Sequence, residues 1–529
     1  MSSKFNGLKF TRQVLCGAFA GLVLLTTACG DKGTDSAKGT DSEIKQEVGA
    51  AEFSYTLPGK FVNWINDLKW MPELMKETGA NVEFVNGGDG ELYYKNIDLK
   101  VGSGKFSDVG MVQLSQAEVY GTKGAFVDLT PYITQYAPNI KKYMDDHPEY
   151  TQLITSSDGK IYALLPQTPK TSIVTFYRED MFQKAGISEL PKTIDEFTEA
   201  LRKLKAAYPD NKNFYPLGGR DNFLRYQSAF EANDRVDAEG KVHGLYNVGQ
   251  NSDLKAPGFK KLIEWYIQLY NEKLVDPEWI SGLAKEENWQ TKVLNNDVAI
   301  SNEFYTRPSW FMMNGGQKTD PNFKMNVMPP FITDSGVQSK FPTAPEYKLD
   351  RAFVINAKSA DKAPAILNFL DYLYTDKGQT FLGWGIEGTT YKKNTDGNNE
   401  FIVDFEEEST KPLGTRAWTF FQDRMTFPVP ANNEAFYQFN ADFTKSFASD
   451  YFSKYTESFP ILNYSTDQLK ERSNFTAKVN EALMSNLVKF VTGKRSMSEW
   501  DVFMKEMDDL GYSKILEIDQ AAYDAVTEK

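Results

Sequence analysis

The chain has 529 residues, with 59 Lys and Arg against 72 Asp and Glu, and a formal net charge of −13 at pH 7. Phosphate binding depends on a basic surface, so this acidic balance argues against nucleic acid as a partner. The length and the many aromatic residues (37 Phe, 27 Tyr and 9 Trp) are enough for two large, well-packed lobes.

The N-terminal residues carry the pattern of an export signal. Three basic residues precede an uncharged, mostly apolar run over residues 14–28, which is too short to span a bilayer comfortably. The run ends in LTTACG, which resembles the lipobox of bacterial lipoproteins, although a threonine stands where lipoproteins prefer an aliphatic residue. The resemblance implies a signal peptide over residues 1–28 and lipidation of Cys29. The alternative is an ordinary signal peptide with a chance cysteine.

Residues 29–50 are predicted to be the lipidated cysteine and a flexible tether. The segment after Cys29 is polar, small and charged, so it lacks the apolar content needed to offset the entropy of ordering. Cys16 would leave with the signal, so no disulfide is expected in the mature chain. The protein is therefore expected at the outer face of the cytoplasmic membrane, in a Gram-positive type of cell envelope.

From residue 51 onward, short β-rich runs alternate with amphipathic helices. The predicted strands are residues 81–85, 108–113 and 172–177. Asp158-Gly159 predicts a hairpin turn between residues 153–154 and 161–163. Helices are predicted at residues 194–204, behind a Thr193 and Glu196 capping box, at 259–270 and at 500–507. This alternation indicates an α/β protein with a largely parallel sheet in each lobe and ligands at the carboxyl ends of strands.

Five motifs, in chain order, resemble the family 1 extracellular solute-binding proteins, in particular their long lipoprotein branch. They are GKFSDVGMV at 104–112, GAFVDLTPYI at 124–133, DGKIYALLP at 158–166, YREDMFQKAGI followed by PKT at 177–193, and DYLYTDKGQTFLGWGIEG at 371–388. The resemblance implies an α/β, two-lobe periplasmic-binding-protein-like fold, with a ligand cleft between lobes joined by a multi-crossover hinge. The first lobe would hold residues 51–166 and about 345–395, and the second residues 167–344 and about 396–529.

The same resemblance implies the function. The protein would capture a carbohydrate, in particular an oligosaccharide, and deliver it to the permease subunits of an ABC importer, as a monomer without a cofactor. A sugar site combines aromatic rings with amides, carboxylates or arginine. The predicted ligand-binding residues are Trp64, Asp108, Gln113, Gln167, Arg220, Tyr305, Trp310, Trp384 and Glu387.

Each of these residues has a specific place and a structural alternative. Trp64 would lie in a polar loop after the first strand, or anchor a helix. Tyr305 and Trp310 follow a stretch similar to one in maltose-binding relatives whose aromatic residue stacks on sugar. Asp108 could instead brace its loop, and Arg220 could form an ordinary salt bridge. Gln167 at the first crossover could be purely structural. Trp384 and Glu387 in the GWGIEG loop could brace that loop instead of binding a ligand.

No catalytic motif supports an enzyme. The two histidines lie outside any HExxH pattern, and neither a GxSxG elbow nor a phosphate-binding loop is present. The acidic run at residues 404–408 is typical of a solvated face rather than a carboxylate pair. Residues 209–216 offer too few oxygen ligands for calcium, so no metal is expected. The alternatives left open are a surface glycoside hydrolase or polysaccharide lyase, and a binding protein for a peptide or polyamine.

Overall fold

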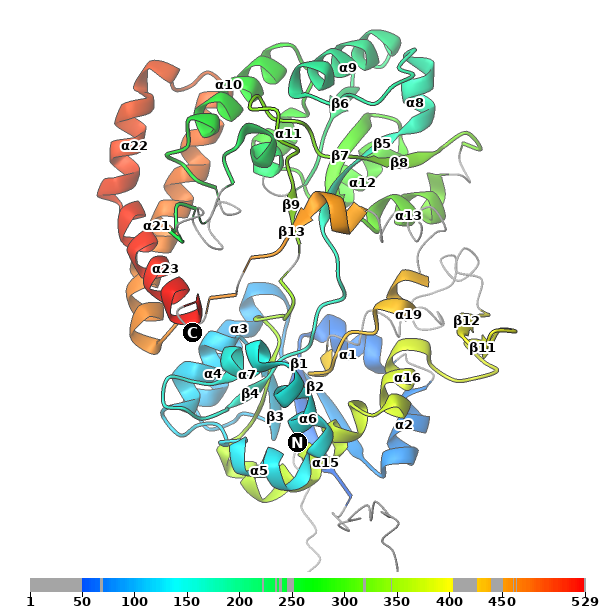
Figure 1. The fold of residues 1–529 in the computed structure, drawn as a ribbon, viewed down its shortest axis with the longest axis vertical. Helices are drawn as coiled ribbons and strands as arrows, with labels where there is room; N and C mark the ends of the chain where they lie inside the picture. Colours follow the sequence, from blue (N-terminus) through cyan, green and yellow to red (C-terminus); the bar gives the residue numbers. More distant parts are fainter. Residues whose placement is uncertain are drawn as a thin grey trace, which may run out of the picture. The chain divides into compact units, whose positions relative to one another are not determined.

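The computed structural model describes residues 50–527, apart from residues 67–69, 221–222, 234–235, 237–239, 245–251, 317–319, 344, 403–425, 439–450, 460 and 463. The predicted signal peptide, Cys29, residues 30–49 of the tether and the whole acidic run at residues 404–408 lie outside the described residues. Within the described part, two main β-sheets are flanked by helices (Figure 1).

Five strands make the first sheet, in the order β2-β1-β3-β10-β4. Their bounds are β1 Glu52–Leu57, β2 Asn81–Asn86, β3 Val109–Val112, β4 Ala163–Leu164 and β10 Ala352–Ile355. Helices surround them: α1 Gly59–Asn66, α2 Met71–Thr78, α3 Gly90–Gly102, α4 Leu114–Gly121, α5 Thr130–Tyr136, α6 Pro138–Asp146, α7 Pro148–Ile154, α15 Ala363–Leu373 and α16 Asp376–Trp384. One continuous hydrophobic core joins these elements, and we call this part the first lobe.

Four strands make the second sheet, in the order β6-β7-β5-β8. Their bounds are β5 Ile173–Arg178, β6 Tyr215–Leu217, β7 Val298–Phe304 and β8 Met325–Met328. The associated helices are α8 Glu179–Lys184, α9 Ile194–Ala207, α10 Pro257–Asn271, α11 Pro277–Ile280, α12 Glu286–Leu294, α13 Arg307–Phe311, α21 Thr466–Val491, α22 Trp500–Asp509 and α23 Tyr512–Thr527. Two separate cores, one on helices α9, α10 and α21 and one under β5 and β7, hold this second lobe together.

Smaller elements complete the described chain. The short helical turns are η1 Leu224–Phe230, η2 Met312–Gly316, η3 Ala357–Lys362 and η6 Met497–Glu499, and a short helix is α19 Asn433–Gln438. Two-stranded ladders pair β9 Phe341–Pro342 with β13 Thr456–Glu457, and β11 Tyr391–Lys393 with β12 Asn399–Phe401. The predicted division of the sequence between the two lobes stays a prediction.

The expectation of largely parallel sheets is wrong in a specific way. β10 runs antiparallel to both of its neighbours in the first sheet, and β5 does the same in the second. Each reversed strand is the first one that the chain forms in its sheet after leaving the other sheet. A chain that crosses between the two carboxyl edges must enter the new sheet in the opposite direction. The crossings therefore explain the reversal, which local sequence patterns cannot reveal.

Most predicted elements are confirmed. Strands occur at β2, β3 and β5, and helices at α9, α10 and α22, within a few residues of the expected bounds. The turn at Asp158-Gly159 also forms, because Ser156 N–H donates to Lys160 O at 2.8 Å and Gly159 adopts a φ of 80°. The first arm of that hairpin is wrong: Leu153 and Ile154 end helix α7, which begins at a proline and buries both side chains.

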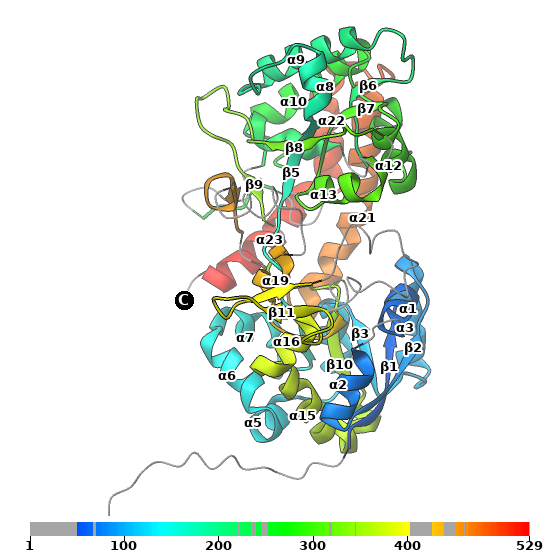
Figure 2. The same cartoon turned by 90° about the vertical axis from the view of Figure 1, so that its right-hand side faces the viewer.

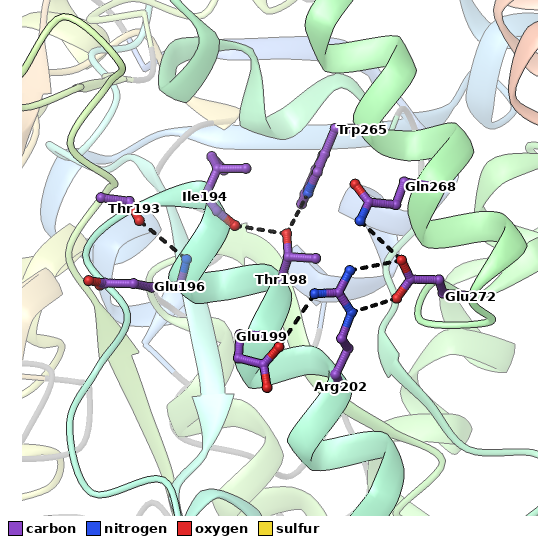
Figure 3. Close-up of polar contacts among 9 residues, drawn as sticks. All are labelled: Thr193, Ile194, Glu196, Thr198, Glu199, Arg202, Trp265, Gln268 and Glu272. Carbon is purple, nitrogen blue, oxygen red and sulfur yellow. Dashed lines mark hydrogen bonds and ion pairs between the residues drawn. The ribbon is translucent and has the colours of Figure 1, made fainter.

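The packing of α9 on α10 shows how local signals and long-range contacts combine (Figure 3). Thr193 Oγ1 accepts a hydrogen bond from Glu196 N–H at 3.2 Å, which is one half of the predicted capping box. The other half differs, since the Glu196 carboxylate accepts from Lys192 N–H at 2.7 Å. Thr198 Oγ1 accepts from the indole of Trp265 on α10 at 2.9 Å, so the two helices also share a buried polar contact.

The C-terminal helices pack chiefly on the second lobe but also contact the first (Figure 2). Apolar residues in the C-terminal half of α21 belong to the core of the second lobe. At the start of α21, Thr466 Oγ1 donates to the carboxylate of Glu118 on α4 at 3.2 Å. The same carboxylate accepts a hydrogen bond from Ser157. Helix α21 therefore links the two lobes independently of the chain crossings. None of the described helices is long and apolar enough to cross a membrane.

Candidate ligand-binding site at the carboxyl ends of the strands

The chain crossings bring the carboxyl edges of the two sheets to the same region. The first crossing leaves β4 at its carboxyl end and enters β5 at Ile173, which pairs with Phe304 at the carboxyl end of β7. The second crossing enters β10 at Ala352, which pairs with Val112 at the carboxyl end of β3. Ligands of α/β proteins bind at such edges, so this region is the candidate site.

Gln167 ties three segments of the chain together at the crossings. Its Nε2 donates to Glu346 Oε1 at 2.9 Å in the second crossing. Its Oε1 accepts from Ala431 N–H at 2.8 Å, and its own N–H donates to Val429 O at 3.0 Å. Gln167 therefore lies at the hinge, as the sequence predicted. In this conformation its side-chain amide is already engaged by protein partners.

Tyrosine hydroxyls of the first lobe hold each crossing segment in place. Tyr150 on α7 bonds to Leu165, accepting from its N–H at 2.9 Å and donating to its carbonyl at 3.2 Å. The Tyr143 and Tyr347 hydroxyls lie 3.2 Å apart at the second crossing. Tyr374 donates to Pro428 O, in the segment of residues 428–431 that also bonds to Gln167. Tyrosine hydroxyls thus hold the first-lobe ends of both crossings and of this segment.

Two arginines and two glutamates form a charged cluster at the carboxyl ends of β6 and β7. Arg220, just after β6, donates from Nε to Glu303 Oε2 at 2.6 Å. Glu286 at the start of α12 lies 3.5 Å from Arg220 NH1 and accepts from Arg307 NH2 at 3.0 Å. Directly after β6, an added Cβ on Gly219 would lie 2.7 Å from the ring of Trp279. Glycine at this position therefore allows the backbone next to Arg220 to approach that ring closely.

Aromatic rings adjoin this charged cluster. Arg307 lies over the rings of Trp310 and Trp289, 5.5 and 5.6 Å from their centroids. Phe304, the last residue of β7, keeps 38% of its surface exposed. An aromatic ring next to arginine and carboxylate groups can bind a ligand that has both apolar C–H faces and hydroxyls. Sequence reasoning missed Phe304, which is the one exposed residue of β7, at its carboxyl end, after six buried ones.

Residues 63–380 match the family described as bacterial extracellular solute-binding protein. This chain belongs to that family. It is 22% identical over 499 residues to the fructooligosaccharide ABC transporter substrate-binding protein FusA of Streptococcus pneumoniae serotype 4, covering 87% of each chain. It is also 19% identical over 280 residues to the lipoprotein LipO of Bacillus subtilis strain 168, covering 51% of this chain and 53% of LipO.

Solved structures of the family share the fold. FusA in complex with kestose aligns with a TM-score of 0.69 at 18% identity, covering 90% of this chain and 99% of FusA. The alginate-binding protein AlgQ2 without calcium aligns with a TM-score of 0.68 at 19% identity, with coverage of 90% and 99%. The predicted two-lobe α/β fold of the binding-protein type is therefore confirmed.

In this solute-binding protein, Tyr305 occupies a different environment from Phe304. Its ring is fully buried and packs against Phe436, Tyr437 and Phe452, with centroids 5.1–6.3 Å away. Burial of the Tyr305 hydroxyl, and to a smaller extent the nearby Tyr437, raises its pKa well above the usual range. No ring face is open to a sugar in this conformation. The predicted stacking role of Tyr305 is untested and would need this packing to open.

Three predicted residues follow strands of the first sheet in the chain. Gln113 directly follows β3, is half-buried, and donates from its N–H to Gln116 Oε1 at 3.0 Å. Trp64 lies within α1, not in a loop, because Phe61, Val62 and Ile65 bury one face of that helix. Gln167 follows β4. The structure thus places Gln113 and Gln167 just after strands of the first sheet, and Arg220 and Trp310 just after strands of the second.

A cationic pair lies at the same edge of the first sheet. The Arg351 guanidinium is 4.6 Å from the centroid of the Phe61 ring. Burial, together with this arginine, lowers the pKa of Lys348 in the second crossing. Neither residue was singled out from the sequence, because nothing local distinguishes them from other basic residues.

Asp108 lies at the amino end of β3, away from the candidate site. Its two oxygens accept from the Ser54 N–H at 2.9 Å, from Ser359 Oγ at 2.6 Å and from Lys362 Nζ at 2.9 Å. Burial opposes ionisation, but these hydrogen bonds outweigh it and lower the pKa of Asp108 to about 2. The carboxylate braces β1, β3 and η3. This geometry supports the structural alternative for Asp108, while a ligand contact remains an untested prediction.

Trp384 and Glu387 differ in exposure. The Trp384 ring is 2% exposed and packs on Phe401 at 4.7 Å between centroids. Glu387 is exposed on the following turn, which pairs with Tyr391. Their part in binding stays a prediction.

Among the described residues, no group of three or more His, Cys, Asp or Glu side chains is placed to hold a metal ion. In the loop of residues 209–216, which has too few oxygen ligands for calcium in the sequence analysis, Asn211 Nδ2 donates to Asp297 Oδ1 at 2.9 Å.

Proposed function

We propose that this solute-binding protein captures a carbohydrate, in particular an oligosaccharide, and delivers it to an ABC importer. The observation that carries the proposal is the cluster of Arg220, Glu303, Glu286 and Arg307 at the carboxyl ends of β6 and β7, with the ring of Trp310 5.5 Å from the Arg307 guanidinium. A pyranose or furanose ring offers C–H groups for stacking and hydroxyls that arginine and carboxylate groups bind at once. A sugar ligand is supported by the similarity to FusA, which is named a fructooligosaccharide ABC transporter substrate-binding protein and has been solved in complex with kestose.

Capture would proceed by closure of the two lobes over the ligand. Residues of the first lobe at the carboxyl edge, including Gln113 and Trp64, would approach those of the second, including Arg220 and Trp310. The tyrosine-held crossings would serve as the hinge for this motion, a movement known from periplasmic binding proteins. The closed form would be the one that the permease subunits recognise. We propose that the protein acts as a monomer and without catalysis.

Calorimetry and thermal shift on the purified chain beginning after Cys29 test this proposal. Neutral oligosaccharides of two to six residues are titrated in parallel with short peptides and with spermidine. A sugar ligand at a hundredfold excess over its dissociation constant should stabilise the protein by about 2.7 kcal/mol. Binding of peptide or polyamine with no response to any sugar would contradict the proposal. Product formed from a glycan above background would show an enzyme instead.

Anchoring is a separate part of the proposal. The described residues begin beyond Cys29, so support comes from the lipobox-like sequence and from the similarity to lipoprotein LipO. In a Gram-positive host, Cys29→Ala should move the protein from the membrane fraction to the medium and abolish labelling with a fatty-acid analogue. Cys16→Ala is the matched control and should leave both unchanged. Membrane retention and labelling of the Cys29→Ala chain would contradict lipidation at this residue.

A further inference from the structure

The charges at the second-lobe edge are balanced by side chains of the protein itself. Arg307 is 16% exposed and has Glu286 as its only ion-pair partner among the described residues. Glu286 is 44% exposed, and its carboxylate contacts both Arg307 and Arg220. Arg220 is also bonded to the buried Glu303. Both guanidinium groups of this edge are thus occupied by carboxylates before any ligand arrives.

Glu286 is held in this place by its position in the fold. It is the first residue of α12, where the unpaired N–H groups and the dipole of the helix favour a negative charge. Gln290, one turn later, donates to Glu286 Oε1 at 2.9 Å. The carboxylate is therefore held by the Gln290 amide and by the guanidinium groups of Arg307 and Arg220, although nearly half of its surface faces solvent.

We propose that Glu286 is a specificity-determining residue that restricts the site to uncharged glycans. This inference rests on the proposed function. Arginine binds carboxylates in a planar, two-pronged geometry, so an Arg307 without a carboxylate partner, next to the ring of Trp310, would suit a uronic acid. Glu286 occupies that position and repels a second carboxylate. A sugar hydroxyl can donate to the same Glu286 and accept from the same Arg307, so a neutral ring meets no such penalty.

The net charge of the whole chain acts in the same direction. At −13 it disfavours the approach of anionic ligands at long range. Long-range repulsion is screened by salt, whereas a local contact with Glu286 is screened much less. Salt dependence can therefore separate the general effect from the effect of this residue.

The test compares Glu286→Gln with the wild type by calorimetry, using a neutral oligosaccharide that the wild type binds and an oligogalacturonate of the same length. The wild type should bind the neutral ligand at least about a hundredfold more tightly than the uronate. Glu286→Gln should bind the uronate about tenfold more tightly than the wild type does, with less than about a threefold change for the neutral ligand. The gain should persist at high salt and disappear in the Glu286→Gln/Arg307→Gln double variant.

Glu287→Gln is the matched control, since this exposed neighbour on α12 has no side-chain ion pair among the described residues. It removes the same charge from the chain and should not raise uronate affinity at high salt. Equal affinity of the wild type for the neutral and the acidic ligand would overturn the inference and leave the proposed function intact. So would a folded Glu286→Gln protein, with an unchanged thermal midpoint, that shows no gain. Failure of every oligosaccharide to bind the wild type would overturn the proposed function and this inference with it.

Discussion

Replacing Asp519 with asparagine is expected to lower the free energy of unfolding by about 3–5 kcal/mol. Asp519 on α23 is fully buried and accepts from Arg472 Nε at 2.6 Å and from Arg472 NH2 at 3.1 Å. Tyr464 donates to the same carboxylate at 2.7 Å. The asparagine would leave the guanidinium charge of Arg472 in a largely desolvated place without a compensating charge. Guanidinium denaturation followed by circular dichroism measures the loss.

The control for this prediction is an ion pair of the same helix that faces solvent. Glu517 pairs with Lys514, and both side chains are more than half exposed. Glu517→Gln should therefore change the unfolding free energy by less than about 0.5 kcal/mol. The double replacement Arg472→Met/Asp519→Leu should lose less than Asp519→Asn alone, because it removes both charges. Equal stability of the Asp519→Asn and Glu517→Gln proteins would contradict the assignment of Asp519 as a buried counter-ion.

Phe304→Ala is expected to weaken oligosaccharide binding by about ten- to a hundredfold, since a stacking aromatic ring supplies roughly 1.5–3 kcal/mol at such a site. The ring ends β7 and is one of few large apolar side chains among the described residues that remain exposed. Because it is already partly in solvent, its removal should cost less than about 1 kcal/mol of stability. Calorimetry with the best oligosaccharide from the binding screen gives the affinity, and thermal denaturation gives the stability.

Tyr305→Phe is the matched comparison for this prediction. The Tyr305 hydroxyl is buried and has no hydrogen-bond partner among the described residues, so removing it should leave binding within about threefold and stability unchanged or slightly higher. A larger loss of affinity in Tyr305→Phe than in Phe304→Ala would show that Tyr305, as the sequence predicted, contacts the sugar. Wild-type affinity in the Phe304→Ala protein would remove Phe304 from the site.

The elements of the fold were largely predictable because their signals are local. Thr193 caps α9 within three residues of its partner, and the apolar residues of α9 and α10 recur within two turns of their helices. The errors lie where a local pattern allows two structures. The segment around Trp64 has polar residues typical of a loop, yet tertiary burial of Phe61, Val62 and Ile65 makes it helical.

The candidate site was predictable only in outline. Arg220, Tyr305 and Trp310 were expected to contact a sugar. Of these, Arg220 and Trp310 lie at the carboxyl edge of the second sheet. Phe304 is the last residue of β7 and is exposed, whereas Tyr305, in the turn that follows, is buried against Phe436 and Phe452. These partners are more than 100 residues away in the sequence, so no local pattern distinguishes the two rings.

The sequence by itself determined the family, through motifs whose order is kept over most of the chain, and the positions of most helices and strands. It also supplies the prediction of export and of lipidation at Cys29, because such signals are read from short stretches of chain. Only the tertiary structure decided the reversed strands, the three-way contact of Gln167, and the pairing of Arg220 with Glu303 and of Arg307 with Glu286. Those partners are tens of residues apart in sequence, and Arg220 and Glu303 are separated by 83 positions. Their meeting depends on how the sheets bring distant strand ends together, and no local pattern encodes that distance.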